Sequence, residues 1–141
     1  MNTVKPSLLY RTAAVLLILF AVAHTLGFNQ PPDPKWGADA LVDSMRSLHF
    51  DVQGSSRTYW DFFTAAGYSV GIVYFFAGIL AWQLGGLPAE PLTRLRGVAW
   101  ALALCFAALT VVSWLYLFLV AVIFSAVVAL LLISAAWLSS R

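Results

Sequence analysis

Apolar side chains run almost without interruption through four stretches of the chain. Each stretch is long enough to cross a bilayer as a helix, which takes about 20 predominantly apolar residues. The last two stretches form one apolar run over residues 95–138, which is too long for a single crossing, so length alone predicts a turn near 114–118. The pattern predicts an all-α fold, a four-helix transmembrane bundle forming a single membrane domain over 1–141. The expected spans are about 7–28, 59–84, 95–115 and 118–138.

The first stretch also has features of a secretory signal peptide. Lys5 and Arg11 flank the start of its apolar core, and Ala21-Val22-Ala23 resembles an A-x-A cleavage site. We interpret the segment as a retained span, and cleavage in the native cell stays open as the alternative.

The loop between the first two spans has a different pattern. Its residues at about 36–48 alternate with the period of an amphipathic helix, which predicts a short helix lying in the membrane interface. Gly54 and the serines beside it are expected to end this helix and lead into the second span. The apolar face holds Leu41, Met45 and Leu48. The polar face holds Asp39, Asp43 and Arg46.

Small residues recur at intervals of about four along the last three spans, where they create grooves for close helix packing. We expect these faces to be internal contacts of the bundle, with chance as one alternative. The second alternative is contact with another subunit, in a homodimer or a larger membrane complex joined through Gly67, Gly71 and Gly78. The small face of the third span consists of Ala99, Ala103 and Ala107. That of the fourth span consists of Ala121, Ser125 and Ala129.

Composition agrees with residence in the lipid bilayer. The 141 residues are 62% hydrophobic and 10% charged, whereas an ordinary soluble domain is about 25% charged. The net charge of +2 is spread along the chain, so nothing indicates binding to nucleic acid. The lone cysteine, Cys105, has no partner for an internal disulfide and is expected to be a small buried hydrophobe.

The distribution of lysine and arginine predicts the orientation. With four spans, one side of the membrane carries five basic residues and the other carries three. The positive-inside rule places the richer side, with both termini, in the cytoplasm and the long first loop outside. The side with five basic residues carries Lys5, Arg11, Arg94, Arg96 and Arg141. The side with three carries Lys35, Arg46 and Arg57.

Ionisable residues gather where the second span begins. Asp61 lies in the first turn of this span, and His24 lies near the end of the first span at about the same expected depth. Such groups are costly in lipid unless they are paired or hydrated. The connecting segment adds His49, Asp51, Gln53 and Arg57.

Each of these residues also has a structural explanation. The helix dipole favours Asp61 at a helix start without any function, and Arg57 can pair with Asp51 or Asp61. Tyr59 and Trp60 stand where an aromatic belt is expected. His49 is explained by solvation alone, and His24 either makes a structural hydrogen bond or handles a ligand or proton.

Several chemistries are compatible with these residues. His24 and His49 are candidate haem ligands, although no CxxCH attachment motif occurs. A metal site of His24, His49, Asp51 and Asp61 matches no common ligand spacing, so no metal and no cofactor are assigned. His24 with Asp61 is a candidate acid/base pair for isomerising or ring-opening a lipophilic substrate, and small helical sterol isomerases resemble the chain in size and span number only.

Three segments resemble a family of small, uncharacterised bacterial four-span integral membrane proteins. They are HTLGF at 24–28, WGADALVDSMRSLHFDVQG at 36–54 and RTYWDFF at 57–63. The resemblance implies a bacterial inner-membrane protein with the usual arrangement of spans, and it brings no activity and no catalytic residues. Relatives in this family carry proline between the last two spans, where this chain has WLYLFL.

These observations predict a polar pocket at the extracytoplasmic end of the bundle that binds a lipophilic small molecule. His24 and Asp61 are the candidate catalytic pair. The alternative function is a non-catalytic accessory subunit of a larger membrane complex. The expected ligand-binding residues are Arg46, His49, Asp51, Arg57, Tyr59 and Trp60.

Overall fold

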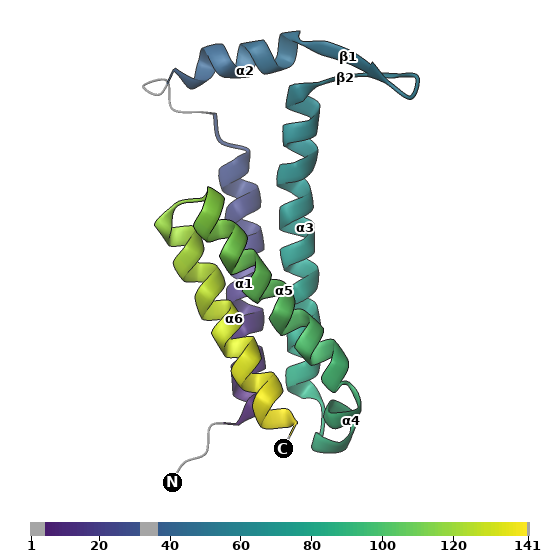
Figure 1. Cartoon of the computed structure of the whole chain (residues 1–141), viewed down its shortest axis with the longest axis vertical. Helices are drawn as coiled ribbons and strands as arrows, with labels where there is room; N and C mark the ends of the chain where they lie inside the picture. The colour runs from purple at the N-terminus through teal and green to yellow at the C-terminus, as the bar shows by residue number, and fades with distance from the viewer. Residues whose placement is uncertain (1–4, 32–36, 141) are drawn as a thin grey trace. The chain divides into compact units, whose positions relative to one another are not determined.

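A computed structural model describes residues 5–31 and 37–140. All four apolar stretches are helices that are long and apolar enough to cross a membrane (Figure 1). The expected all-α class and the number of spans are therefore confirmed, and the chain is a multi-pass membrane protein. The four helices are α1 (Pro6–Phe28), α3 (Tyr59–Gly86), α5 (Arg96–Tyr116) and α6 (Leu119–Ser139).

The turn between α5 and α6 lies where the length of the apolar run places it. Helix α5 ends at Tyr116, and Leu117 and Phe118 adopt extended backbone conformations before α6 begins at Leu119. Extended φ and ψ values are open to any residue. The chain therefore turns here without the glycine or proline that usually marks such a break.

The chain forms two compact units, and helices α1 and α3 contribute to both. The bundle unit comprises Met1–Leu19 and Tyr74–Arg141, and therefore includes α4 (Ala89–Arg94) as well as α5 and α6. The loop unit comprises Phe20–Val73.

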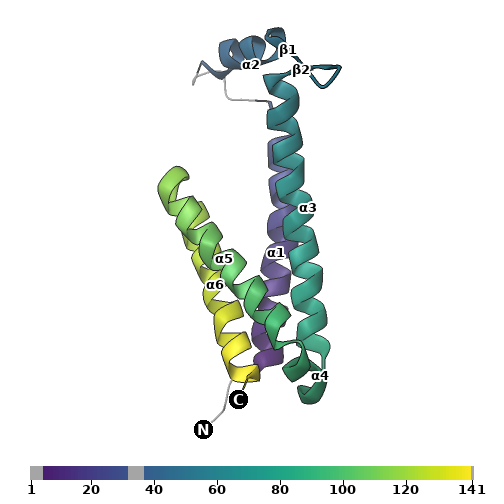
Figure 2. The same ribbon diagram turned by 45° about the vertical axis from the view of Figure 1, so that its right-hand side comes forward.

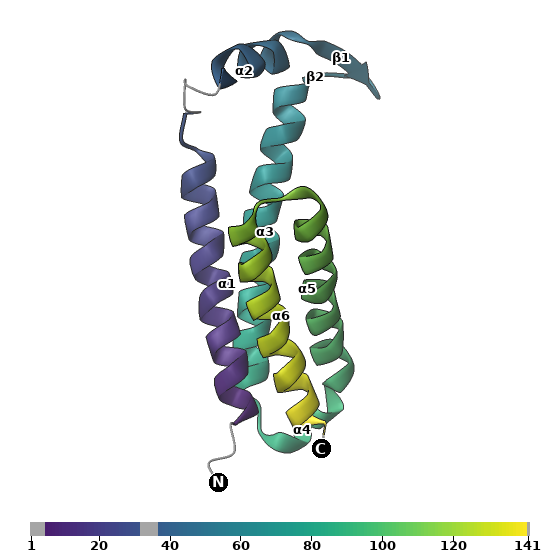
Figure 3. The same ribbon diagram turned by 60° about the vertical axis from the view of Figure 1, so that its left-hand side comes forward.

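Small side chains fill the core of the bundle unit, in which α5 and α6 lie side by side (Figure 3). Ala99 and Ala103 of α5 are buried, as are Ser125 and Ala129 of α6. These four positions of the expected small faces are therefore internal contacts, whereas Ala107 and Ala121 are half-buried. Because lipid provides no hydrophobic drive for helices to associate, such close packing is what holds these helices together.

The same principle joins α1 to α3 within the bundle unit. A Cβ atom added at Gly78 would lie 2.7 Å from Cγ1 of Ile18 and 3.2 Å from the carbonyl oxygen of Ala14. At Gly85 it would lie 3.0 Å from Cβ of Tyr10. Gly78 and Gly85 are therefore the sites in this unit where α1 and α3 approach closely, and α1 fills the groove that they create.

Cys105 is exposed on α5, so its expected burial is wrong. Ala103 and Phe106 point into the core of the bundle unit. Successive helical residues are about 100° apart, so Cys105, next to Phe106, is turned off the packed face.

The loop unit contains the expected amphipathic helix, α2 (Ala38–Ser47), which follows Gly37. Gly37 has φ of 65°, a conformation that glycine adopts without steric cost. Trp36, the first residue of the expected helix, lies outside the described residues.

An antiparallel hairpin of two strands, β1 (His49–Val52) and β2 (Ser55–Thr58), follows α2 and was not expected. Gly54 does not end the helix, because α2 already ends at Ser47. Gln53 and Gly54 have φ of 50° and 78°, and two positive values are the signature of the tight type I′ turn. Helix α2 and the hairpin lie across the N-terminal end of α3 (Figure 2).

Candidate functional site

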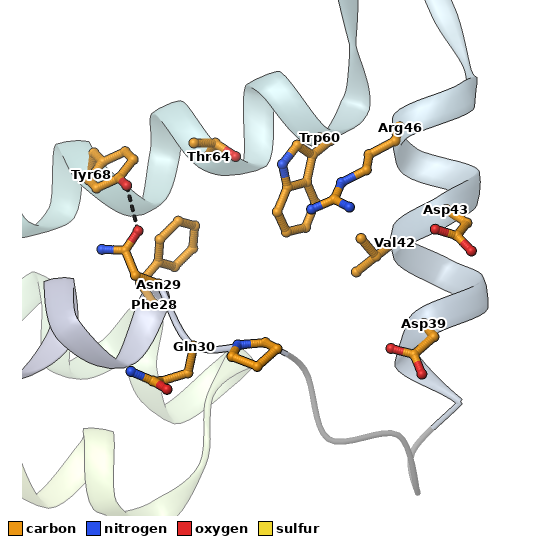
Figure 4. Close-up of a pocket in the computed structure, with 11 residues that line it drawn as sticks. Phe28, Asn29, Gln30, Asp39, Val42, Asp43, Arg46, Trp60, Thr64 and Tyr68 are labelled. Atoms are coloured by element: carbon orange, nitrogen blue, oxygen red, sulfur yellow. Dashed lines mark hydrogen bonds between the residues drawn. The ribbon is translucent and has the colours of Figure 1, made fainter.

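A cavity of about 640 Å³ lies within the loop unit, between the C-terminal end of α1, helix α2 and the start of α3 (Figure 4). Its size falls within the range of small-molecule pockets, about 300–1,000 Å³. The cavity is partly open to the outside. It is lined by Phe28, Asn29, Gln30, Pro31, Asp39, Val42, Asp43, Arg46, Trp60, Thr64 and Tyr68.

Aromatic rings form one side of the cavity. The ring of Phe28 meets that of Tyr68 edge-on, with centroids 5.7 Å apart, and also contacts Phe63 at 5.2 Å. The hydroxyl of Tyr68 donates a hydrogen bond of 2.6 Å to Oδ1 of Asn29. This bond fixes the Tyr68 ring against the end of α1, so the aromatic side is built from two helices.

Helix α2 turns its charged face to the cavity. Asp39, Val42, Asp43 and Arg46 recur at the spacing of one helical face, and all four line the cavity. The guanidinium carbon of Arg46 lies 4.7 Å from the centroid of the Trp60 ring, within the range of a cation–π contact. The cavity therefore has a charged wall opposite an aromatic one.

The two carboxylates of this wall have no ion-pair or hydrogen-bond partner among the described residues. Asp39 and Asp43 are one turn apart on α2 and both are exposed. Like charges at this spacing destabilise a helix slightly. A positive group placed between them would relieve that repulsion.

The apolar face of α2 points away from the cavity. Leu41 is 61% exposed and Leu48 is 56% exposed. On a helical wheel Leu41 lies about 160° from Asp39 and Asp43, and Leu48 is the C-cap residue that follows α2. The amphipathic helix therefore presents polar groups to the spans and apolar groups to its surroundings.

A polar atom of the cavity wall has no described partner. The Oγ1 atom of Thr64 is inaccessible to solvent and makes no hydrogen bond with the described residues. Threonine in a helix often donates to the carbonyl four residues earlier, as Thr25 does to Ala21 at 2.8 Å. Thr64 lines the cavity, but its unpartnered hydroxyl is turned away from the cavity surface.

His24 joins α1 to α3 beside the cavity but does not line it. Its Nε2 atom lies 3.1 Å from the carbonyl oxygen of Gly67. Since a carbonyl oxygen only accepts, Nε2 carries the hydrogen and donates it. The imidazole also stacks between Phe20 and Phe28, with centroid distances of 5.5 and 6.0 Å. His24 therefore supports Phe28, which does line the cavity.

Asp61 caps the N-terminus of α3. Its Oδ2 atom accepts a 2.8 Å hydrogen bond from the backbone N–H of Thr58, and its own N–H donates to Oγ1 of Thr58 at 3.1 Å. This reciprocal pair is a capping box, in which each side chain accepts a hydrogen bond from the backbone N–H of the other residue at the start of the helix.

The described hydrogen bonds do not pair Asp61 with His24. His24 binds at the level of Gly67, which is six residues along α3 and so about 9 Å further along its axis than Asp61. Six residues also turn the helix by about 240°, to a different face. The two residues are thus separated in depth and direction, contrary to the expected common level.

The remaining expected ligand-binding residues divide into two groups. Arg46 and Trp60 line the cavity. The others lie on the hairpin or, for Tyr59, at the first residue of α3, and they are absent from the cavity lining. The His49 ring is held by a hydrogen bond of 3.0 Å between Nδ1 and the carbonyl of Ser47. The group absent from the lining is His49, Asp51, Arg57 and Tyr59.

No three described residues among the histidines, cysteines and acids come together as a candidate metal site. The candidate set of His24, His49, Asp51 and Asp61 is therefore not assembled in the described part of the chain. Haem ligation through Nε2 of His24 would require its hydrogen bond to Gly67 to break.

The sequence contains signals for the cavity residues that were missed. Trp60, Thr64 and Tyr68 recur every four positions and so share one face of α3. Asp39 and Asp43 share the polar face of α2 with Arg46, which was the only member of that face expected in the pocket.

Comparisons of the chain with protein-family models, with curated proteins and with solved structures find no match.

Proposed function

We propose that this multi-pass membrane protein binds a lipophilic small molecule, with the polar end of that molecule held in the cavity of the loop unit. The observation that carries the proposal is the pairing of an aromatic wall with a charged wall around about 640 Å³ of space. Ligand pockets are mostly apolar with a few placed polar groups that fix orientation.

The contacts of the two candidate catalytic residues favour binding over acid–base chemistry. The Nε2 hydrogen of His24 is committed to Gly67, and Asp61 is committed to the cap of α3. A general base must lie within hydrogen-bonding reach of its substrate. Neither residue lines the cavity, so the proposed function is binding without a chemical step.

We place the protein in a bacterial inner membrane, with its termini in the cytoplasm and the loop unit outside. The resemblance of residues 24–63 to small bacterial four-span proteins supports the membrane, and five basic residues against three support the orientation. Reporter fusions test this: a fluorescent protein at the C-terminus should fold in the cytoplasm, and alkaline phosphatase inserted after Gly54 should be active. The reverse pattern would overturn the orientation.

Extraction of small molecules from the purified protein tests the binding proposal. Protein purified in a neutral maltoside detergent from its own host should release a compound that is enriched over the Trp60→Ala variant. Trp82→Ala is the matched control, because it also removes a tryptophan that an arginine covers, with Arg11 at 5.3 Å, but lies outside the cavity lining. Equal extracts from all three proteins would contradict the proposal.

The exposed apolar face of α2 favours a second function, an accessory subunit that docks on another membrane protein. Leu41 and Leu48 point away from the cavity and are more than half exposed. Docking through this face predicts that Leu41→Ser with Leu48→Ser abolishes co-purification of the partner and leaves the cavity ligand bound. The glycines considered for docking already face α1, so a partner at Gly67, Gly71 or Gly78 would have to displace that helix.

A further inference from the structure

We infer that the cavity recognises a cationic head group, a protonated alkyl amine. This inference rests on the proposed function of the same cavity and names its ligand class. Its basis is the charge, the aromatic surface and the unpartnered hydroxyl that the lining residues bring together.

The charged residues of the lining leave an excess of negative charge. Asp39 and Asp43 contribute two carboxylates and Arg46 contributes one guanidinium. Within the described lining, the net charge is therefore −2 + 1 = −1. A partly open cavity of this sign attracts a cation and repels an anion.

The position of Arg46 leaves the carboxylates available. Arg46 is three residues beyond Asp43 on α2, a spacing at which the two side chains can meet. Its guanidinium instead lies over the Trp60 ring, and no ion pair joins it to Asp39 or Asp43 among the described residues. The carboxylates are thus free to pair with a ligand.

The Trp60 ring already holds a cation. The face of an indole ring attracts positive charge through its quadrupole, and tryptophan is the strongest side chain for this contact. Arg46 occupies that face at 4.7 Å in the described structure. An entering ammonium group competes with Arg46 for the same ring, so Arg46 is expected to oppose binding of a cation.

Thr64 becomes an acceptor for an N–H group once rotation of its side chain turns the hydroxyl, which is inaccessible to solvent in the described structure, into the cavity. Its Oγ1 atom is buried at the cavity wall with no described partner. A hydroxyl can accept as well as donate. A protonated amine carries both the positive charge that the carboxylates attract and N–H donors, whereas an alcohol lacks the charge and a carboxylate ligand carries the opposite one.

The experiment compares three probes with the same ten-carbon chain: decylamine, decanol and decanoate. Binding to the full chain is measured by calorimetry at pH 7 in neutral maltoside micelles. Decylamine is expected to bind more tightly than both others. Asp43→Asn should weaken decylamine binding by up to about fivefold, the effect of one exposed ion pair.

The Arg46→Gln variant distinguishes a cationic ligand from an anionic one by whether binding becomes tighter or weaker. It should strengthen decylamine binding about threefold, because it removes a like charge and the group that covers Trp60. An anionic ligand would use Arg46 as its anchor and would be weakened by the same change. Asp51→Asn is the matched control, since it removes an exposed carboxylate of the hairpin that does not line the cavity, and it should change nothing.

The failures of the two proposals are distinguishable. If decanol or decanoate binds as well as decylamine and Trp60→Ala abolishes that binding, the cavity is a ligand site and the cation inference is wrong. If no probe binds more strongly than to Trp60→Ala, the proposed function fails as well. Butylamine separates two sources of the same chemistry: binding equal to decylamine indicates a free amine, and much weaker binding indicates an amphiphile of the membrane.

Discussion

The Nε2 atom of His24 donates a hydrogen bond of 3.1 Å to the carbonyl oxygen of Gly67. This contact joins α1 and α3 in the loop unit at a glycine, where a Cβ atom would collide with the ring of Phe28. The imidazole stacks on that same ring. His24 and Gly67 therefore help to position Phe28, together with Phe63 and Tyr68, and Phe28 lines the cavity.

Replacing His24 with alanine is expected to destabilise the protein by about 1–2 kcal/mol, through loss of one hydrogen bond and two ring contacts. Thermal unfolding followed by circular dichroism in maltoside micelles measures the change. His49→Ala is the control, because His49 is exposed and bonds only to a neighbouring carbonyl. Equal effects of the two changes would contradict a structural role for His24.

Alanine at Gly67 or Gly71 is expected to separate α1 from α3. A Cβ at Gly71 would lie 2.5 Å from Oγ1 of Thr25, and one at Gly67 would run into the Phe28 ring. Overpacking of this kind costs about 1–3 kcal/mol. The same unfolding assay should show this loss for both variants.

Gly27→Ala is the matched control for these glycines. Gly27 also lies in a helix, but nothing comes within 4 Å of its added Cβ. Alanine is the better helix former, so this change should be neutral or slightly stabilising. Comparable destabilisation at Gly27 would show that helix propensity, rather than the contact between α1 and α3, explains the results.

The capping box at Thr58 and Asp61 gives a separate prediction. Thr58→Ala should lower the free energy of unfolding by about 1 kcal/mol, the usual worth of an N-cap. Asp61→Glu and Asp61→Gln should keep the stability of the parent, since both side chains serve in capping boxes. Loss of ligand binding in Asp61→Gln at unchanged stability would instead restore a functional role for the carboxylate.

The turn of the hairpin is expected to require Gly54. Gly54→Ala forces a Cβ into a conformation with φ of 78° and should cost about 1 kcal/mol. Gln53→Asn should stabilise the hairpin, because Asn-Gly is the preferred pair for a type I′ turn. Amide hydrogen exchange of the β1 and β2 backbone measures both; slower exchange in Gly54→Ala would contradict this account.

The spans were predictable because hydrophobic length alone determines them. The turn at Leu117 and Phe118 lies where an apolar run of two spans must fold back. The hairpin was missed because its strands have only four residues each and β2 is polar, so Gly54 was interpreted as a helix terminator. The pair Gln53-Gly54 was the available signal.

The cavity was predictable only in part. The sequence placed Arg46 and Trp60 at one site, but residue pattern does not specify which face of α2 is directed to the spans. The sequence also predicts similar depths for His24 and Asp61. In the structure His24 bonds to Gly67, which is six residues further along α3 than Asp61, so the two residues do not pair. The sequence pattern therefore locates the helices, whereas the residues that line the cavity depend on which face each helix turns toward it.

Native mass spectrometry of the intact protein, gently extracted from its own host's membrane, tests the central claim most directly. The account predicts an added mass of a few hundred daltons (on the order of a lipid or smaller amphiphile), present in the parent and in Trp82→Ala and lost in Trp60→Ala. The contradicting result is a bare protein in all three, or an adduct that Trp60→Ala retains in full.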